Sequence, residues 1–395
     1  MDKMEFTPGN PQEEAPKRVE KKSNKKLRIA LIVLAVLVIV GVLTAVLWDA
    51  NTFDGLRRRF LYARAEKDEN GCAMLYDYSG DRAARYAGLG GSLLIASPSQ
   101  IRLIGDQGTV EFEESVRFQS CVIAQRGELA AVCDVGGSDV YLINSAGLVR
   151  HMEVDGQLIS ATLNEKGYLA LTVNDTGYKA SVKVYDDSGK PVFDFHSADR
   201  FIMSAAVSRD CRYVTAVTLG ESDGAFANRP VTYRLNSTKP VNKVDVSGGV
   251  VFDVGPVGKR MCAVAEDALY LLSASGEVEH TWRFGNDTLR RCDLCGDGYA
   301  TVLLGHYKTG TKCRLVTVKE DGTVLGQREL DGDVVNLSAS GRYVAVLFTD
   351  HMTIYDKTLK ELATLTEVST VRQVMVRSDG SAVLAGLTSA SLYLP

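Results

Sequence analysis

The chain has 395 residues, with 45 Lys and Arg against 49 Asp and Glu, and a formal net charge of -4. Hydrophobic residues make up 45% and charged residues 24% of it, which are ordinary globular values and exclude intrinsic disorder, collagen and coiled coil for most of the chain. The slightly acidic balance argues against a nucleic-acid partner, because proteins that bind nucleic acids usually carry a basic surface.

The N-terminal segment, residues 1–28, contains three prolines and many charged residues. This composition predicts a short disordered tail. Seven Lys and Arg lie between Lys17 and Arg28, so the end of the tail is basic.

An uncharged apolar run, Ile29–Trp48, follows the tail. Its 20 residues would span about 30 Å as an α-helix, which is the thickness of a bilayer core. A buried core helix would need an amphipathic stripe, and a cleaved signal peptide would have a shorter apolar core and a small-residue cleavage site. The run is apolar all round, so we predict a single uncleaved transmembrane helix whose partner is the lipid bilayer.

The basic residues around this run predict its orientation. Seven precede it, and four follow it at a similar distance (Arg57, Arg58, Arg59 and Arg64). Because Lys and Arg concentrate on the cytoplasmic side, we expect a cytoplasmic N-terminus in the cell membrane and an extracytoplasmic C-terminal domain. Residues 49–70 would be a juxtamembrane linker, either a short amphipathic helix or a plain stalk. Residues 71–395 would be the exported domain, with 32 Lys and Arg against 39 Asp and Glu.

From residue 71 the chain shows short apolar runs rich in Val, Leu, Tyr and Thr, separated by Gly, Asp, Ser and Asn, a pattern of strands and turns. One turn before an apolar strand recurs at intervals of 39 to 47 residues. A second turn, such as Ser188-Gly189, follows later in each unit. Four antiparallel strands in about 40 residues form the unit of a β-propeller blade. The recurring first-turn positions are Gly127, Gly167, Cys211, Gly258, Gly298, Gly341 and Gly380.

The repeat predicts an all-β fold, a β-propeller of about eight four-stranded blades. Seven blades are the alternative, because the first unit is the weakest match. A pair of β-sandwiches would not need a fixed period across the domain. The last unit has three strands before Pro395, and Ala73–Tyr78 could supply the fourth and close the ring.

With this plan, residues 71–395 resemble the bacterial propellers related to the WD-repeat and quinoprotein-like superfamilies. The whole chain resembles single-pass, membrane-anchored propeller proteins of Gram-positive anaerobes, for which no function is implied. The tryptophan motifs of WD repeats and quinoproteins are absent, since the chain has only Trp48 and Trp282. The resemblance therefore implies the fold and the anchor, and carries over no catalytic residue.

All eight cysteines lie in the predicted propeller. Six residues before each recurring turn position, and six after nearly all of them, the residue is apolar or Cys, which predicts two buried columns. Cys121 and Cys133 fall in these columns and are expected to be free core thiols, with a strained disulfide between them as the alternative. The other members of the first column are Ala161, Ala205, Phe252, Cys292, Val335 and Val374.

Motifs for catalysis or cofactor binding are scarce. Cys292-Asp293-Leu294-Cys295 has redox or metal spacing, but it lacks a helix start and a second ligand pair, so a structural role is favoured. The five histidines are dispersed, and we predict no metal site. The sequence contains no P-loop, dinucleotide fingerprint, nucleophile elbow or HExxH motif, and we expect no cofactor.

Loop length is the better indication of function. In propellers the connections between second and third strands share one face with the connections between blades. Three such segments stand out: Asn174–Lys179, Gly220–Pro230 and Gly305–Lys312. Long loops on a rigid scaffold often carry binding sites, with a neutral insertion as the alternative. The candidate binding residues, whose side chains suit an interface, are Tyr178, Phe226, Arg229, Tyr307 and Lys308.

We therefore expect a membrane-anchored extracytoplasmic binding or scaffold protein that engages a protein or a cell-envelope carbohydrate through one loop face. The alternative is a cell-envelope hydrolase or lyase with carboxylates converging on the central channel. A channel pocket lined by two or more Asp, Glu or His would favour the enzyme. A third possibility is a scaffold whose helix itself contacts other membrane proteins, but the lone small residue Gly41 is weak support for it.

Overall fold

The structure is a computed structural model of the whole chain. It describes residues 25–47, 54–55, 58, 62, 67–78, 81–105, 108–222, 225–246, 249–307 and 310–395, without the side chains of 25–28, 42–47, 74–75, 222 and 225. The chain divides into two compact units, Met1–Leu56 and Arg57–Pro395. The predicted tail up to residue 24 and most of the predicted linker lie outside the described residues.

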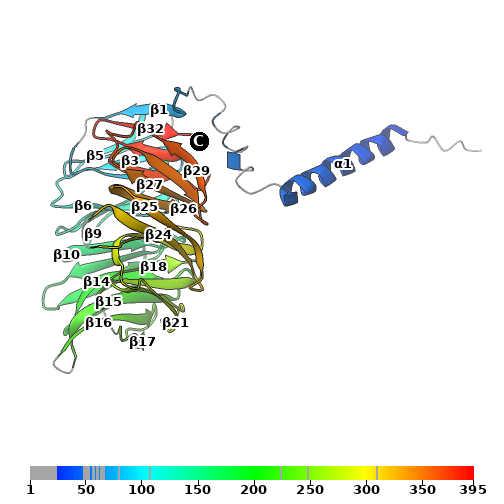
Figure 1. The fold of residues 1–395 in the computed structure, drawn as a ribbon. Coiled ribbons are helices and arrows are strands. Elements are labelled where there is room, and N and C mark those ends of the chain that lie inside the picture. Colours follow the sequence, from blue (N-terminus) through cyan, green and yellow to red (C-terminus); the bar gives the residue numbers. More distant parts are fainter. Residues whose placement is uncertain are drawn as a thin grey trace, which may run out of the picture. The chain divides into compact units, whose positions relative to one another are not determined.

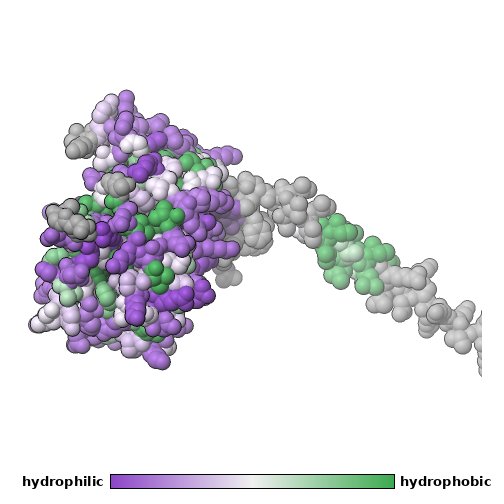
Figure 2. Space-filling view, turned by 90° about the horizontal axis from the view of Figure 1, so that it is seen from below, coloured by the Kyte–Doolittle hydropathy of each residue, from purple (hydrophilic) through white to green (hydrophobic). Residues whose placement is uncertain are grey.

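In its described part, the first unit contains a long helix, α1 (Lys25–Leu47). The large apolar side chains from Ile29 to Val40 are all exposed, by 49% to 62% of their surface, and they form a continuous hydrophobic segment in Figure 2. Among the residues that the structure describes in full, no helix reaches the length and apolarity of a membrane span.

The second unit contains eight four-stranded antiparallel sheets in its described part (Figure 1). The predicted propeller of eight blades is confirmed, and the alternative of seven is wrong. Blade 1 consists of β2 (Arg85–Leu89), β3 (Ser92–Ala96), β4 (Gln100–Ile104) and β5 (Val110–Ser115). Blade 2 consists of β6 (Cys121–Arg126), β7 (Leu129–Asp134), β8 (Asp139–Asn144) and β9 (Gly147–Glu153). Blade 3 consists of β10 (Gln157–Leu163), β11 (Leu169–Asn174), β12 (Ala180–Tyr185) and β13 (Pro191–Ser197). Blade 4 consists of β14 (Phe201–Val207), β15 (Tyr213–Ser222), β16 (Ala225–Arg234) and β17 (Pro240–Lys243).

The remaining blades continue in chain order. Blade 5 consists of β18 (Val251–Val257), β19 (Arg260–Ala265), β20 (Ala268–Leu272) and β21 (Val278–Arg283). Blade 6 consists of β22 (Thr288–Asp293), β23 (Tyr299–Gly305), β24 (Lys312–Lys319) and β25 (Val324–Asp331). Blade 7 consists of β26 (Val334–Ser340), β27 (Tyr343–Phe348), β28 (Met352–Asp356) and β29 (Glu361–Leu365). Blade 8 consists of β30 (Gln373–Val376), β31 (Ala382–Ala385), β32 (Ser389–Tyr393) and, from the start of the unit, β1 (Cys72–Asp77).

Burial explains the hydrophobic pattern of the strands. Second strands such as β23 and β27 are buried at every residue, because neighbouring blades cover both faces of each sheet. In the sequence these strands are continuous apolar runs. Burial of each large apolar side chain there contributes about 1.5–3 kcal/mol to the free energy of folding. Fourth strands such as β21 are mostly exposed and carry polar residues.

The ring is closed by strands from both ends of the second unit. β1 pairs antiparallel with β32, with Cys72 opposite Tyr393 and Asp77 opposite Ser389. The predicted closure by Ala73–Tyr78 is therefore confirmed to within one residue. We name the two ends of the ring by its connections: first and second strands join at the turn end, whereas second and third strands, and successive blades, join at the loop end.

The backbone of the recurring turns supports the predicted repeat frame. Gly127 and Gly341 have φ values of 60° and 55°, in the left-handed region that favours glycine. Cys211 occupies the same place in blade 4 with φ 57°, although it has a side chain. The irregular member of the repeat thus keeps the turn geometry of the others.

The first predicted column is only partly buried. Cys121, Ala205 and Val374 are buried, but Phe252 is 41% exposed. Phe252 lies at a β-bulge between Val251 and Asp253, which turns its side chain out of the sheet's regular alternation. The turn after β18 has only two residues, so counting back from Gly258 does not reach the position that Ala205 holds in blade 4. The second column is buried throughout, from Cys133 to Gly386.

All eight cysteines are free. Cys121 and Cys133 are buried core thiols, as predicted, and burial raises the pKa of both. The alternative of a disulfide between them is wrong.

The predicted loop Gly220–Pro230 is largely regular structure. β15 and β16 have ten residues each and stay paired out to Ser222 and Ala225. The hairpin projects beyond its neighbours in Figure 1. The prediction of a loop was wrong because glycine and polar residues weaken the strand signal, although backbone pairing tolerates them.

Candidate functional site

The predicted binding residues lie at the loop end, in blades 3, 4 and 6. Tyr178 is 47% exposed in the turn after β11, Phe226 is 68% exposed on β16, and Tyr307 is 69% exposed after β23. Arg229 forms an ion pair with Asp245. Lys308 lies outside the described residues.

Neighbouring blades add two aromatic side chains that the sequence analysis missed. Phe201 opens β14 and is 51% exposed, and Phe252 stands beside it in the order of blades, at the start of β18. Lys179, next to Tyr178, places its ammonium 4.8 Å from the centre of the Phe201 ring. Blades 3 to 5 therefore present four exposed aromatic residues at the loop end, which we call the aromatic patch: Tyr178, Phe201, Phe226 and Phe252.

Polar contacts hold the hairpin that carries Phe226. The Asn228 side chain accepts the N–H of Val251 at 2.7 Å and donates to the carbonyl of the same residue at 3.0 Å, so it links β16 to blade 5. Arg200 donates from Nε to Thr218 at 3.0 Å and also donates to the carbonyl of Ala227. The hairpin is therefore fixed to blade 5 and to the connection that precedes β14 of its own blade.

Tyr307 belongs to a different group, because blade 6 is two blades away from the hairpin. Arg290 donates to its carbonyl at 3.0 Å. Beside it, His306 contacts Asp287 at 3.0 Å and Glu329 at 2.6 Å, and Arg314 contacts Asp287 at 2.5 Å. The hydrogen bond to Glu329, followed by that to Asp287, raises the pKa of His306. Asp287, His306, Arg314 and Glu329 line an open groove of about 470 Å³.

One further group at the rim of blade 2 has metal-ligand chemistry. One ligand atom from each of Asp139, His151 and Glu153 lies within 4.8 Å of the others. His151 contacts Asp139 at 2.7 Å and stacks on Tyr141 with ring centres 4.1 Å apart. Exposed acidic clusters of this kind are common without a metal, so we assign no site to it.

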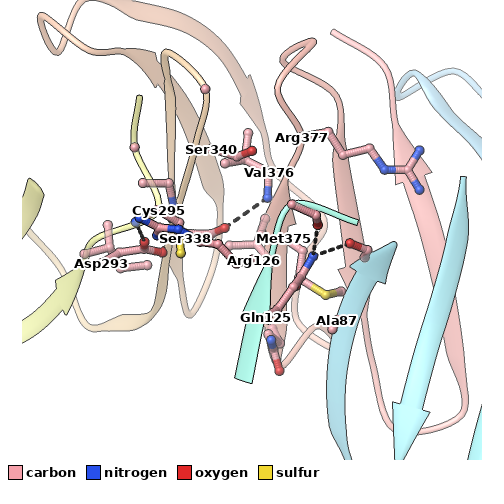
Figure 3. Close-up of a pocket in the computed structure, with 18 of the residues that line it drawn as sticks. Ala87, Gln125, Arg126, Asp293, Cys295, Ser338, Ser340, Met375, Val376 and Arg377 are labelled. Atoms are coloured by element: carbon pink, nitrogen blue, oxygen red, sulfur yellow. Dashed lines mark hydrogen bonds between the residues drawn. The ribbon is translucent and has the colours of Figure 1, made fainter. Parts of the chain in front are cut away.

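The sequence analysis also missed a pocket of about 490 Å³ at the turn end. It lies among the first strands of blades 1, 2, 6, 7 and 8, around the axis of the ring, and we call it the central pocket. Figure 3 shows Asp293, Cys295 and Ser338 gathered on one side of it and Arg377 on the other. The polar residues that line it are Gln125, Arg126, Glu165, Asp293, Cys295, Asp297, Asn336, Ser338, Ser340, Gln373 and Arg377.

In the described part of the chain each four-stranded sheet stays within one blade, and polar side chains join the neighbouring first strands around this pocket. Ser338 accepts the N–H of Val376 at 3.1 Å, and Gln373 donates to the carbonyl of Tyr86 at 3.0 Å. Each such bond satisfies a backbone group that the twisted sheets leave unpaired. The other bonds of this kind join Asn336 to Val374, Asp293 to Ala339, Gln125 to Gly88 and Thr162 to Ala205.

Arg126 crosses the pocket. Its guanidinium donates to the carbonyl of Leu294 at 2.9 Å and to that of Pro256 at 2.6 Å. These contacts join blade 2 to blades 5 and 6, on the opposite side of the ring. Nothing in the local sequence indicates this pairing, because 168 residues separate Arg126 from Leu294.

The carboxylates and the thiol of the pocket are mostly engaged by the protein. Asp293 accepts the N–H of Cys295 at 2.7 Å and that of Ala339 at 2.9 Å, and burial raises its pKa. Glu165 pairs with Arg209 at 2.8 Å. Cys295 is exposed to the pocket, but burial within the surrounding protein and the charge of Asp293 raise its pKa to about 12.

A segment that precedes the ring docks beside this pocket. Arg58 donates to the carbonyls of Asp379 and Pro395. The Tyr62 hydroxyl accepts an N–H of Arg377 at 3.2 Å and contacts the Asp379 carboxylate at 3.4 Å. Since Arg377 also lines the central pocket, this segment contacts the pocket wall directly.

Comparison with solved structures shows the fold alone, because all identities are low. The C-terminal WD40 domain of Sif2 is similar with a TM-score of 0.57 and 13% identity, over 81% of this chain and 96% of that domain. The designed protein Ika8 has a TM-score of 0.56 and 11% identity, over 80% and 98%. BamB from Moraxella catarrhalis has a TM-score of 0.50 and 13% identity, over 81% and 99%. No curated protein matches the chain.

A protein-family model covers most of the chain and nearly the whole ring. The model is described as a family of unknown function, DUF5711, and matches residues 72–385. The match begins at the first residue of the ring-closing strand β1 and ends in β31 of the same composite blade. The chain therefore belongs to the family of unknown function DUF5711.

Proposed function

We propose that this protein is a membrane-anchored binding protein whose propeller engages a protein partner outside the cell through the aromatic patch. The observation that carries the proposal is the 68% exposure of Phe226 on a hairpin that the contacts of Asn228 and Arg200 hold in place. Exposed aromatic side chains on a rigid support lose little conformational freedom when they bind, and such residues dominate the energy of protein interfaces.

The residues near the patch favour a protein partner. Lys179 places its ammonium over the Phe201 ring, and Arg200 donates to the carbonyl of Ala227, next to Phe226. Arg is enriched with aromatic residues at protein interfaces. Tyr307 lies apart from this surface, so we place it outside the proposed interface. Arg229, whose guanidinium is paired with Asp245, would lie at the edge of the interface.

The enzyme alternative receives less support from the same structure. The central pocket does contain three carboxylates, Glu165, Asp293 and Asp297. However, both oxygens of Asp293 accept backbone N–H groups and Glu165 pairs with Arg209, which leaves Asp297 without a second carboxylate to form an acid–base pair. These contacts favour binding over hydrolysis.

The partner can be tested by mild crosslinking in native membranes, purification and mass spectrometry with four versions of the full chain. We expect one protein to be recovered with the wild type and with Val278→Ser, a control for an exposed apolar residue on the outer strand β21. Phe226→Ser and Phe201→Ser should each reduce its recovery at least tenfold, and purified partner should bind the wild type directly. Equal recovery with all four versions would contradict the proposal.

The anchor is proposed from the sequence run Ile29–Trp48, of which the structure describes side chains only to residue 41. Leu37→Arg would place a charge at the middle of the span, at a cost of about 2.5–3.5 kcal/mol. We expect alkaline carbonate to release this variant from membranes, but to leave the wild type and Leu37→Ile in the pellet. Release of all three would contradict the anchor, whatever the result for the aromatic patch.

A further inference from the structure

The central pocket is separate from the proposed interface, because it lies at the turn end whereas the aromatic patch lies at the loop end. Its volume of about 490 Å³ is in the range of small-molecule sites. Six of the eight blades contribute to its wall, so its shape depends on the closed ring.

The fixed charges of the pocket nearly cancel. Glu165 is neutralised by Arg209, and the Asp293 carboxylate is held by two N–H groups. Arg126 directs its guanidinium to two carbonyls. The lining then holds two cations, Arg126 and Arg377, and two anions, Asp293 and Asp297. A ligand with a strong net charge would therefore find no excess of the opposite sign.

The polar groups that remain for a ligand include both donors and acceptors. Gln125 and Gln373 use their amide nitrogens in bonds to the ring, and each keeps a carbonyl oxygen. Asn336 uses its oxygen and keeps its NH₂ group. Ser338 accepts the N–H of Val376 and keeps its O–H as a donor. A hydroxyl group both donates and accepts, so hydroxyls on a ligand can pair with either kind of group.

Apolar side chains complete the wall. Ile123, Leu337 and Met375 line the same pocket as the amides and serines. A sugar ring presents C–H groups on its faces and hydroxyls at its edge, and it carries no net charge. We propose that the central pocket binds a neutral saccharide of one or two rings.

The test uses the purified full-length chain in detergent and ligand-observed NMR. The probes are the common hexoses, the N-acetylhexosamines and their β-1,4-linked disaccharides at millimolar concentration. Ser340 lines the pocket, and Ser340→Leu would fill part of it. Ser120→Leu makes the same change at an exposed residue of the loop end. We expect a saccharide to bind the wild type and Ser120→Leu, and to bind Ser340→Leu at least tenfold more weakly.

A second measurement guards against a variant that disturbs the ring. Cys295 lines the pocket, and Cys211, in a turn of blade 4, does not. Because the pKa of Cys295 is raised to about 12, its alkylation at a pH of about 8.5 should be slow and needs a long incubation. The bound saccharide should slow it further in the wild type and leave alkylation of Cys211 unchanged, as read by peptide mass spectrometry.

Three outcomes would overturn the proposal. One is that no probe binds, and another is that Ser340→Leu binds as well as the wild type while Cys295 stays unprotected. The third is that glutamine or inorganic phosphate binds in place of every saccharide, which would overturn the ligand class. Phe226→Ser should leave saccharide binding unchanged, so a failure here is distinguishable from a failure of the proposed protein interface.

Discussion

The two ends of the propeller use their conspicuous side chains in different ways. At the turn end, polar residues such as Arg126 and Ser338 bond to the backbone of other blades. At the loop end, Phe226 and Phe201 stand largely in solvent, and the polar residues near them hold the hairpin rather than the ring. The difference shows that a polar residue at a pocket can serve the stability of the fold. An exposed aromatic residue that contributes little to stability instead indicates an interaction with another molecule.

The largest effect on stability is expected at Arg126, which crosses the ring. Arg126→Met keeps much of the side-chain length but removes the bonds to Leu294 and Pro256. Hydrogen bonds from a charged donor contribute about 1.5–3 kcal/mol each, so losing two should lower the free energy of unfolding by about 3 kcal/mol or more, measured by urea unfolding.

Arg212→Met is the matched control for this change. The Arg212 side chain is 71% exposed and contacts Asp210, so its loss should cost less than about 0.5 kcal/mol. Equal effects of the two substitutions would contradict the view that Arg126 braces the turn end.

A smaller effect is expected from a single bond between neighbouring blades. Ser338→Ala leaves the N–H of Val376 without its partner and should cost about 1 kcal/mol. Ser188→Ala removes an exposed bond to Asp186 and should be close to neutral. If Ser338→Ala is also neutral, the bonds between first strands do not stabilise the ring.

The loop end should show a pH dependence through His306. Hydrogen bonds to Glu329 and Asp287 raise its pKa above 6.5, so the protonated form is favoured in the folded chain. That stabilisation is complete below the unfolded pKa, and it should be lost as the pH rises from about 6.5 through the folded pKa. His306→Gln should reduce this decline in the unfolding midpoint, whereas His280→Gln, on the exposed part of an outer strand, should not. The effect should be modest, because solvent screens the exposed partners.

The smallest effect on stability is expected at Phe226. Its side chain is 68% exposed, so Phe226→Ser should change the free energy of unfolding by less than about 0.5 kcal/mol. The same variant should lose the partner in the crosslinking experiment. A large loss of stability would show that Phe226 is structural and would remove the contrast between the two ends.

The propeller was accessible from sequence because its information is local and repeated. Each blade carries its own left-handed turn residue, a glycine except for Cys211 in blade 4, and its own buried second strand. An error in one blade, such as the position of Phe252, therefore does not affect the count of blades. The strand pairing of β1 with β32 was also predictable, because the last unit lacked one strand.

The central pocket was not predictable in the same way. Its wall is built from residues that the ring brings together from blades far apart in the chain, such as Arg126 and Leu294. The bonds of Gln373 and Asn336 depend on the register between blades, which no periodic pattern encodes. The aromatic patch was found only in part, because Phe201 and Phe252 look like ordinary strand residues until the bulge and the exposed edge are known.

The pairing of β1 with β32 also constrains how the protein is made. Cys72 can pair only after Tyr393 has been synthesised, which is 321 residues later. At about 5–20 residues per second, the first strand spends roughly 15–60 s without its partner. During that interval β1 offers an unpaired edge that other chains could join. A ribosome that stops before Ser389 releases a chain that cannot close its last blade, so quality control of this protein depends on completing a strand almost at the end of the ring.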